Sequence, residues 1–336
     1  RYDLRGLVRG VGRSEPNLAC AEELAAADGR SSFTSLMARC RDRLTAAGVD
    51  LSAYTTRDNA LDVDDVRRAL GYRQIDLHGI SYGTRLALEV LRVRPDGIRS
   101  VILDGVLPPD ARLVGDLART LDDNVTRIFR GCAGAPACGA AFPDLEGSFS
   151  ALQARLETAP LSTSFGPIDW RAFVGVLGQA MYEPDGVRRV PLWVHDLAAR
   201  GQAAFDEHLA PWLDGSSAAP PAPPAPRVAE VERALEALSR DPVEAARLLG
   251  TSEGMFTSIL CSDSAQYETL EEALAISATV RPGLRDERDL REQFEVCASW
   301  PKAPRRDDTR APVTSPVPTL SLGGEFDPVT PAAWAE

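Results

Sequence analysis

The sequence has no long uninterrupted run of apolar residues, although apolar residues make up 44% of its 336 positions. A membrane-spanning helix needs about 18 or more such residues in succession, so the sequence predicts no membrane span. Acidic residues outnumber basic ones, giving a formal net charge of −12 at pH 7, and no cluster of lysine or arginine stands out. Because nucleic acids and anionic membranes repel such a surface, we expect the chain to bind neither.

Histidine is also scarce, with only three in the chain. None of the cysteines follows a C-x-x-C spacing that is typical of zinc sites. The sequence therefore predicts no metal centre, and it contains no motif that calls for a cofactor.

The six cysteines fall into three local groups, and six cysteines allow 15 pairings. The groups are Cys20 with Cys40, Cys132 with Cys138, and Cys261 with Cys297. The sequence alone does not choose among the pairings, but disulfides between neighbours are the simplest interpretation. They would place the protein outside the cell or in the cell envelope. The alternative is six reduced, buried thiols in a cytosolic protein.

Residues 76–84 carry a G-x-S-x-G motif between an apolar strand and an amphipathic helix. This pattern predicts a nucleophile elbow, a sharp strand-to-helix turn that exposes a serine. Ser81 would be the nucleophile, and the amide of Tyr82 at the positive end of the helix would face an oxyanion. We expect glycine at Gly79 and Gly83 because a Cβ at either position would collide with the backbone. The alternative is a buried serine in a glycine-rich turn.

The segments around the motif alternate between helix and strand. Helical spacing of apolar residues is seen over 57–70 and from the motif to Pro95, and apolar strands are expected at 74–78 and 100–104. Such alternation predicts an α/β fold with a mostly parallel sheet and helices on both faces.

Three regions of the chain differ in pattern. Residues 1–109 show the alternation just described, 110–312 are mainly helical, and 313–336 return to strand and loop. We therefore expect a large helical cap, residues 110–312, inserted between strands of the sheet. The helices expected in it cover 113–130, 149–156, 170–182, 190–200 and 228–249. The proline-rich stretch 214–227 predicts a solvated linker rather than a ligand for a proline-recognition module.

A carboxylate follows the last expected strand, 317–322, in the segment Gly323-Gly324-Glu325-Phe326-Asp327. Catalytic groups gather past the carboxyl ends of parallel strands, and the acid of a hydrolase triad belongs after a late strand. Asp327 is therefore the candidate acid. Without Ser81 upstream, it would be interpreted as a turn residue.

Five stretches together resemble the α/β-hydrolase serine peptidases of the proline iminopeptidase and tripeptidyl aminopeptidase group. They are RGVGRSEPNLAC at 9–20, YTTRDNALDVDDVRRALGY at 54–72, GISYGTRLALEVLRVRPDGIRSVILDGVLPP at 79–109, ILCSD at 259–263 and VPTLSLGGEFDPVTP at 317–331. The resemblance implies an α/β-hydrolase fold with a helical cap, Ser81 as nucleophile and Asp327 as acid. It also implies cleavage of short peptide or aminoacyl substrates from the amino end. The cysteine pairs resemble those of the secreted branch.

The chain departs from the pattern of this family in three places. The family's Gly-Gly-Pro-Gly type segment, which supplies an oxyanion amide, is not found, and Asp3-Leu4-Arg5-Gly6 is followed by a second Arg9-Gly10. The Gly-His turn expected beyond Asp327 is not found either. His78, His195 and His208 are not convincing substitutes, because the first is expected to pack beside the site and the others lie in expected cap helices. We therefore expect the chain as given to be an inactive fragment, or half of a site completed elsewhere.

An aminopeptidase must hold the ammonium group of its substrate, which a carboxylate in low dielectric does well. Asp263, at the end of ILCSD, is one candidate for this contact, and Glu325 is its competitor.

The leading functional hypothesis is a serine aminopeptidase of the prolyl or tripeptidyl type. A carboxylesterase or another small-molecule hydrolase is the alternative, because fold and triad do not fix the acyl substrate. A non-catalytic binding protein on the same fold is the third, favoured by the missing histidine. No sequence feature indicates an oligomeric state or a preferred amino-terminal residue.

Overall fold

The computed structural model describes residues 8–12, 14–20, 22, 32–163, 166–213 and 252–336. The expected linker 214–227, the expected helix 228–249 and the segment Asp3–Gly6 lie outside the described residues.

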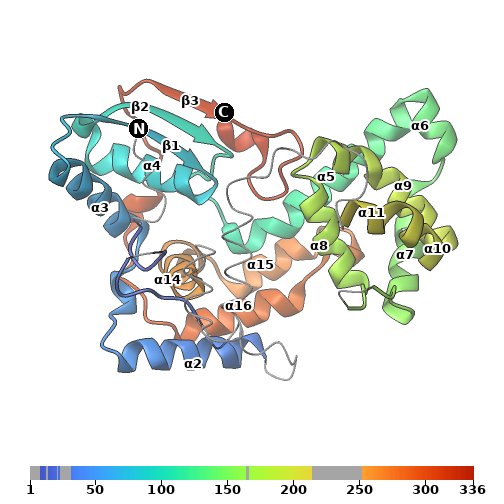
Figure 1. Ribbon diagram of the computed structural model, residues 1–336, viewed down its shortest axis with the longest axis horizontal. Helices are drawn as coiled ribbons and strands as arrows, with labels where there is room; N and C mark the ends of the chain where they lie inside the picture. The colour runs from blue at the N-terminus through green and yellow to red at the C-terminus, as the bar shows by residue number, and fades with distance from the viewer. Residues whose placement is uncertain (1–7, 13, 21, 23–31, 164–165, 214–251) are drawn as a thin grey trace.

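The centre of the fold is a parallel sheet with the order β1 (Ile75–Ile80), β2 (Ile98–Asp104) and β3 (Thr319–Leu322). Helix α4 (Tyr82–Val93) connects β1 to β2, and α3 (Thr56–Ala69) packs against α4 (Figure 1). The expected helix and strand alternation is confirmed. The sheet therefore carries the ends of all three strands at one edge, where β1 runs into α4.

Only one face of this sheet is covered in the part of the chain that the structure describes. Val101 and Leu103 are buried with apolar residues of α4, because alternate side chains of a strand point to the same face. The opposite face presents exposed apolar side chains, which are Ile80, Ile102, Leu320 and Leu322. Parallel sheets are normally buried on both faces, so this surface is unusual.

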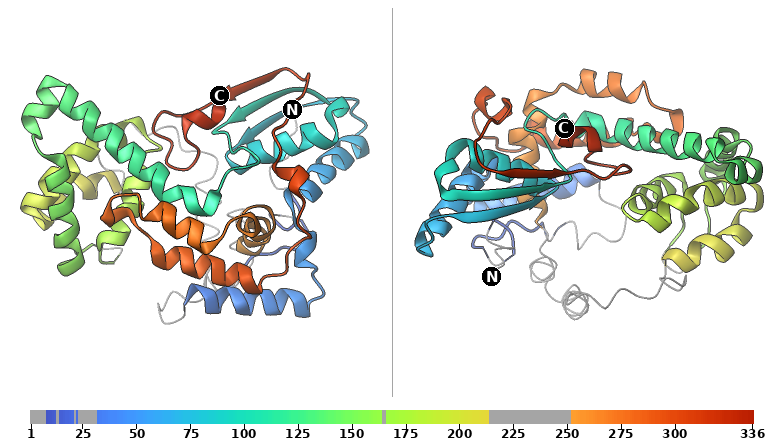
Figure 2. Two further views of the ribbon diagram at one scale, coloured as in Figure 1. Left: turned by 180° about the vertical axis from the view of Figure 1, so that it is seen from behind. Right: turned by 90° about the horizontal axis from the view of Figure 1, so that it is seen from above.

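After β2 the chain leaves the sheet and forms a bundle of helices (Figures 1 and 2). They are α5 (Leu113–Gly134), α6 (Pro136–Ala141), α7 (Leu145–Thr158), α8 (Trp170–Ala180), α9 (Pro184–Arg200), α10 (Gln202–Ala204), the π-helical turn η3 (Phe205–Leu209) and α11 (Ala210–Leu213). Their apolar faces enclose a core that includes the fully buried Phe173 and Trp193. Four of the five helices expected in the cap are thus observed, and most run longer than the sequence predicts.

A second group of helices packs beneath the sheet in Figure 1. It consists of α2 (Phe33–Ala46), α14 (Glu253–Asp263), α15 (Leu270–Ser277) and α16 (Glu287–Ser299). Met37 of α2 shares an apolar cluster with Leu260 and with Trp300, which follows α16. Residues assigned to the first part of the core and to the cap therefore share one cluster, and the expected domain boundaries stay a prediction.

Single-turn helices lie at the junctions between these elements. They are η1 (Leu51–Ala53), η2 (Pro95–Gly97), η4 (Ala265–Tyr267), η5 (Pro282–Leu284), η6 (Asp307–Arg310) and η7 (Ala332–Ala335).

Three disulfides cross-link the helical regions, and they join the neighbouring cysteines as the simplest interpretation predicts. The pairs are Cys20–Cys40, Cys132–Cys138 and Cys261–Cys297, with Cα separations of 5.3, 5.1 and 5.1 Å. The last of them ties α14 to α16.

No helix among the described residues is both long and apolar enough to cross a membrane.

Candidate active site

Ser81 occupies the turn between β1 and α4 in a strained backbone conformation. Its φ of 53° and ψ of −121° make it the one non-glycine residue of the described chain with a positive φ. Such strain persists only where the surroundings enforce it, and it is common at active sites. The Ser81 amide donates to the Asp104 carbonyl oxygen at 2.9 Å, which ties the turn to the end of β2. The side chain is exposed and makes no capping hydrogen bond.

The two glycines of the motif serve different purposes. A Cβ on Gly79 would lie 2.3 Å from the carbonyl oxygen of Gly83, so glycine is required there as predicted. A Cβ on Gly83 would meet nothing within 4 Å apart from its chain neighbours and the backbone of its own helix, and the prediction of a collision at Gly83 is wrong. The backbone carbonyl group of Gly83 is what lies close to Gly79, whereas a Cβ on Gly83 itself would point into open space.

Asp327 lies in the acid loop, residues 323–331, which follows β3. The loop approaches the serine turn beside Gly105, the residue after β2, whose amide donates to the Leu322 carbonyl oxygen at the end of β3 at 3.0 Å. A Cβ on Gly105 would be 3.3 Å from Asp327 Oδ2 and 3.9 Å from the Ser81 amide nitrogen. The structure therefore brings Ser81 and the Asp327 carboxylate together at one edge of the sheet. Their catalytic roles stay a prediction.

The Asp327 carboxylate is held by its own loop. Oδ1 accepts hydrogen bonds from the amides of Val329 and Thr330 at 2.9 and 2.8 Å, and Oδ2 accepts one from the Thr330 hydroxyl at 2.6 Å. Burial and the negative charge of Asp327 raise the pKa of the Tyr182 phenol. The orientation of the acid is thus fixed by neighbours close in sequence.

Tyr82 is the first residue of α4, so its amide is one of those that an α-helix leaves without an intrahelical acceptor. This is the position expected of an oxyanion donor. The phenol of Tyr82 points elsewhere, since it accepts from Asn59 Nδ2 at 3.2 Å and donates to Thr56 Oγ1 at 3.3 Å. Burial raises the pKa of this phenol.

None of the three histidines has a described contact with Ser81 or Asp327. His78 is exposed on the open face of the sheet, with Nε2 4.0 Å from Asp104 Oδ2. His195 of α9 and His208 of η3 both contact Asp196, at 2.9 and 3.0 Å, in the helical bundle on the far side of the molecule from β1 (Figure 1).

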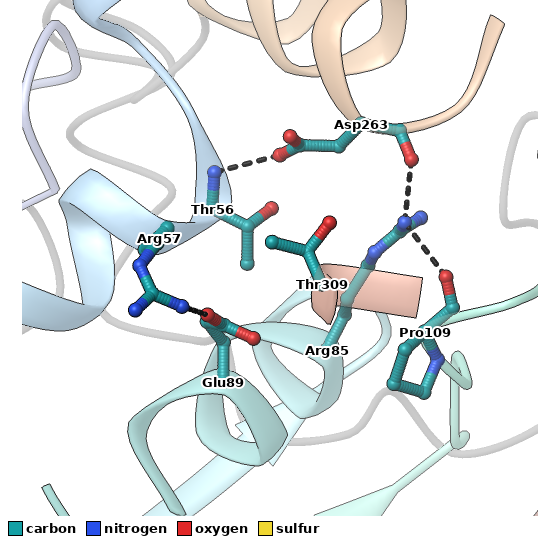
Figure 3. Close-up of a pocket in the computed structure, with 7 residues that line it drawn as sticks. All are labelled: Thr56, Arg57, Arg85, Glu89, Pro109, Asp263 and Thr309. Carbon is teal, nitrogen blue, oxygen red and sulfur yellow. Dashed lines mark hydrogen bonds and ion pairs between the residues drawn. The ribbon is translucent and has the colours of Figure 1, made fainter. Parts of the chain in front are cut away.

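Asp263 lies at the junction of α14 with α3 and α4 (Figure 3). Its carboxylate accepts a hydrogen bond from the amide of Thr56 at 2.7 Å, while Arg85 donates to the Asp263 carbonyl oxygen at 2.6 Å and to that of Pro109 at 2.9 Å. Burial raises the pKa of Asp263 and lowers that of Arg85. The cavity between these residues measures about 10 Å³, room for about one water molecule.

These contacts tie the end of α14 to the first residue of α3 and to Arg85 of α4. Glu325 is exposed in the acid loop, two residues ahead of Asp327. The substrate-amine contact assigned to these two carboxylates stays a prediction.

Within the described ranges, no group of three or more histidine, cysteine or acidic residues is arranged to hold a metal ion.

The structure adds one residue to the site that the sequence does not indicate. Asn124 of α5 donates hydrogen bonds to the backbone of the acid loop, although nothing in its local sequence marks it. Asn124 precedes the two residues that it contacts by 202 and 203 residues in the sequence, so only the folded chain reveals the contact.

Comparison with known proteins covers both halves of the site. The family described as alpha/beta hydrolase fold matches residues 8–166, which contain Ser81, and the family described as TAP-like protein matches residues 287–336, which contain Asp327.

Two relatives illustrate the similarity. Serine protease Hip1 of Mycobacterium tuberculosis (strain ATCC 25618 / H37Rv) is 30% identical over 129 residues, which are 33% of this chain and 24% of that protein. Tripeptidyl aminopeptidase of Streptomyces lividans is 30% identical over 122 residues, 32% of this chain and 22% of that protein. The matched region thus spans about a quarter of each relative. The chain has an α/β-hydrolase fold, and its resemblance to the serine peptidases of that fold is confirmed.

Proposed function

We propose that the chain carries the nucleophile and the acid of a serine aminopeptidase that cleaves short peptides from their amino end. The observation that carries this proposal is the strained, exposed Ser81 beside the Asp327 carboxylate at one sheet edge. The similarity to a serine protease and to a tripeptidyl aminopeptidase supports the peptide substrate.

In this mechanism Ser81 Oγ attacks the scissile carbonyl carbon and transfers its proton to a histidine. The histidine then protonates the leaving amine as the C–N bond breaks, and water hydrolyses the resulting acyl-enzyme. Asp327 orients the imidazole and stabilises its positive charge, while the Tyr82 amide stabilises the oxyanion. Because no histidine of this sequence contacts the site, we expect efficient turnover to require a histidine beyond the three present.

We propose that a carboxylate holds the substrate ammonium group, with Glu325 or Asp263 as the candidate. Glu325 is exposed near the acid, whereas the Asp263 carboxylate already binds the Thr56 amide. Replacing the correct residue with alanine should raise KM for free-amine anilides far more than for amino-blocked esters. Equal effects on both substrates would remove that residue from the proposal.

The three disulfides support an extracellular or envelope location. Thiol alkylation of protein recovered without a reductant should leave all six cysteines unmodified.

The experiment compares aminoacyl and tripeptidyl anilides, amino-blocked anilides and short-chain esters as substrates. The enzymes are the 336-residue chain and the same chain extended by a Gly-rich oxyanion segment and a Gly-His segment. We expect turnover of free-amine anilides by the extended chain only, abolished by Ser81→Ala. Preference for esters over anilides would indicate the carboxylesterase alternative, and Ser81-dependent turnover by the short chain would show that a present histidine or a partner chain supplies the base.

A further inference from the structure

The acid loop is held from outside by a side chain of α5. Asn124 Nδ2 donates to the carbonyl oxygens of Phe326 and Asp327, both at 3.0 Å. Asn124 is 3% exposed, so the two bonds are shielded from water. An amide group has two N–H hydrogens, and these contacts use both of them.

The chemistry of this contact specifies asparagine. Two carbonyl oxygens that converge on one buried nitrogen require a group with two donors. Aspartate would place oxygen against oxygen, and an apolar residue of the same shape would leave both carbonyls without this donor. The contact therefore depends on the amide nitrogen itself.

The same stretch of loop also packs into the cap. The side chain of Phe326 contacts the apolar cluster that α5 shares with the other cap helices. Within the loop, the Asp327 carboxylate accepts hydrogen bonds from Val329 and Thr330. The loop backbone is thus held by α5, and the carboxylate is held by the loop. The distance from the carboxylate to Ser81 consequently depends on α5.

We propose that Asn124 is a positioning residue, which sets the Asp327 carboxylate at the distance from Ser81 that a bridging imidazole requires. The proposal rests on the proposed function of Ser81 and Asp327. It also makes the docking of α5 against the acid loop a condition for an aligned triad.

The test uses the hydrolase with its triad histidine present and compares Asn124→Ala and Asn124→Asp with a matched control. The control is Thr120→Val, about one turn earlier on α5. Thr120 is 5% exposed and its hydroxyl donates to Asp116 within the same helix. Its replacement therefore removes a buried hydrogen bond without touching the acid loop.

We expect the Asn124 variants to lower kcat for an aminoacyl anilide about 10- to 100-fold, with KM changed by less than about twofold. The acidic limb of the kcat/KM profile should move to lower pH, because an imidazolium without its aligned carboxylate loses its proton more readily. Thr120→Val should leave both the rate and the profile unchanged. Variants of Asn124 that keep the wild-type kcat and profile would overturn the proposal.

Hydrogen exchange provides a readout that does not depend on activity. In Asn124→Ala, the peptide covering 323–331 should exchange about tenfold faster, since the bonds to Val329 and Thr330 open with the loop. Exchange no faster than in Thr120→Val would overturn the positioning role at any level of turnover. If exchange accelerates in Asn124→Ala but turnover of the parent enzyme survives Ser81→Ala, the loop contact is supported and only the proposed function is overturned.

Discussion

The close approach of the serine turn and the acid loop can be probed by adding one methyl group. Gly105 has a φ of +65°, and a Cβ there would be 2.9 Å from Thr330 Oγ1 and 3.3 Å from Asp327 Oδ2. Gly71, at the end of α3, offers a matched control. Its φ is +75°, but a Cβ there would meet nothing within 4 Å. The two glycines share the backbone requirement and differ in their surroundings.

Both substitutions to alanine place an L side chain in the left-handed region, which costs about 1–2 kcal/mol. Both also reduce the entropy of the unfolded chain, which offsets about 0.4–1 kcal/mol of that cost. Only Gly105→Ala crowds the site, and a crowded methyl group in a packed region costs a further ~1–3 kcal/mol. The difference in unfolding free energy between the two variants therefore measures the crowding at the acid.

Urea unfolding followed by circular dichroism gives the two free energies, and anilide hydrolysis by the histidine-containing enzyme gives the effect on the site. We expect Gly105→Ala to be less stable than Gly71→Ala and to lose about tenfold or more in kcat. Gly71→Ala should keep its wild-type kcat. Equal stability losses, or equal kcat values, would refute the placement of Asp327 beside Gly105.

Three further predictions concern the disulfides, Asp286 at the N-cap of α16, and the serine turn. The chain-entropy model assigns about 3.8 kcal/mol to the Cys261–Cys297 disulfide, whose cysteines are 36 residues apart, and about 2.2 kcal/mol to Cys132–Cys138, whose cysteines are 6 apart. Cys297→Ser should therefore lower the free energy of unfolding, measured in urea, more than Cys138→Ser does. Burial and a neighbouring aspartate raise the pKa of Asp286 to about 6, so the folded chain binds that proton more tightly and stability falls as pH rises from about 4 to about 6. Asp286→Asn should therefore raise the melting temperature at pH 7 and not at pH 4, and a gain at both would contradict the cause. Gly79→Ala should prevent correct folding of the turn and Gly83→Ala should not, as soluble yield and fluorophosphonate labelling would show; equal tolerance would reject the geometry of the turn.

The serine turn and the helices and strands around it could be predicted from the sequence because their determinants are local. The G-x-S-x-G spacing fixes a turn within nine residues, and the alternation of apolar residues identifies β1, β2 and α4. Asp327 could be anticipated because parallel strands end at the same edge of a sheet. The disulfide pairs were open among 15 possibilities, and only their closeness in sequence favoured the pairs that form.

Other features depend on contacts between distant segments. Asn124 touches the acid loop across 202 residues, and its surrounding sequence resembles any polar helix face. The sequence predicts a collision for a side chain at Gly83, but a Cβ there points into open space. The motif that ends at Asp263 suggests a substrate contact, but it does not indicate that the carboxylate is buried and accepts a hydrogen bond from the Thr56 amide. Side-chain direction and burial decide these cases, and neither is readable from residue type.

The central claim is that Ser81 is the activated nucleophile of a serine hydrolase. It is tested most directly by peptide mapping of the fluorophosphonate adduct on the histidine-containing enzyme, beside its Ser81→Ala variant. We expect one adduct, on Ser81, and no labelling of the variant. An adduct on another serine, or labelling that survives Ser81→Ala, would contradict it.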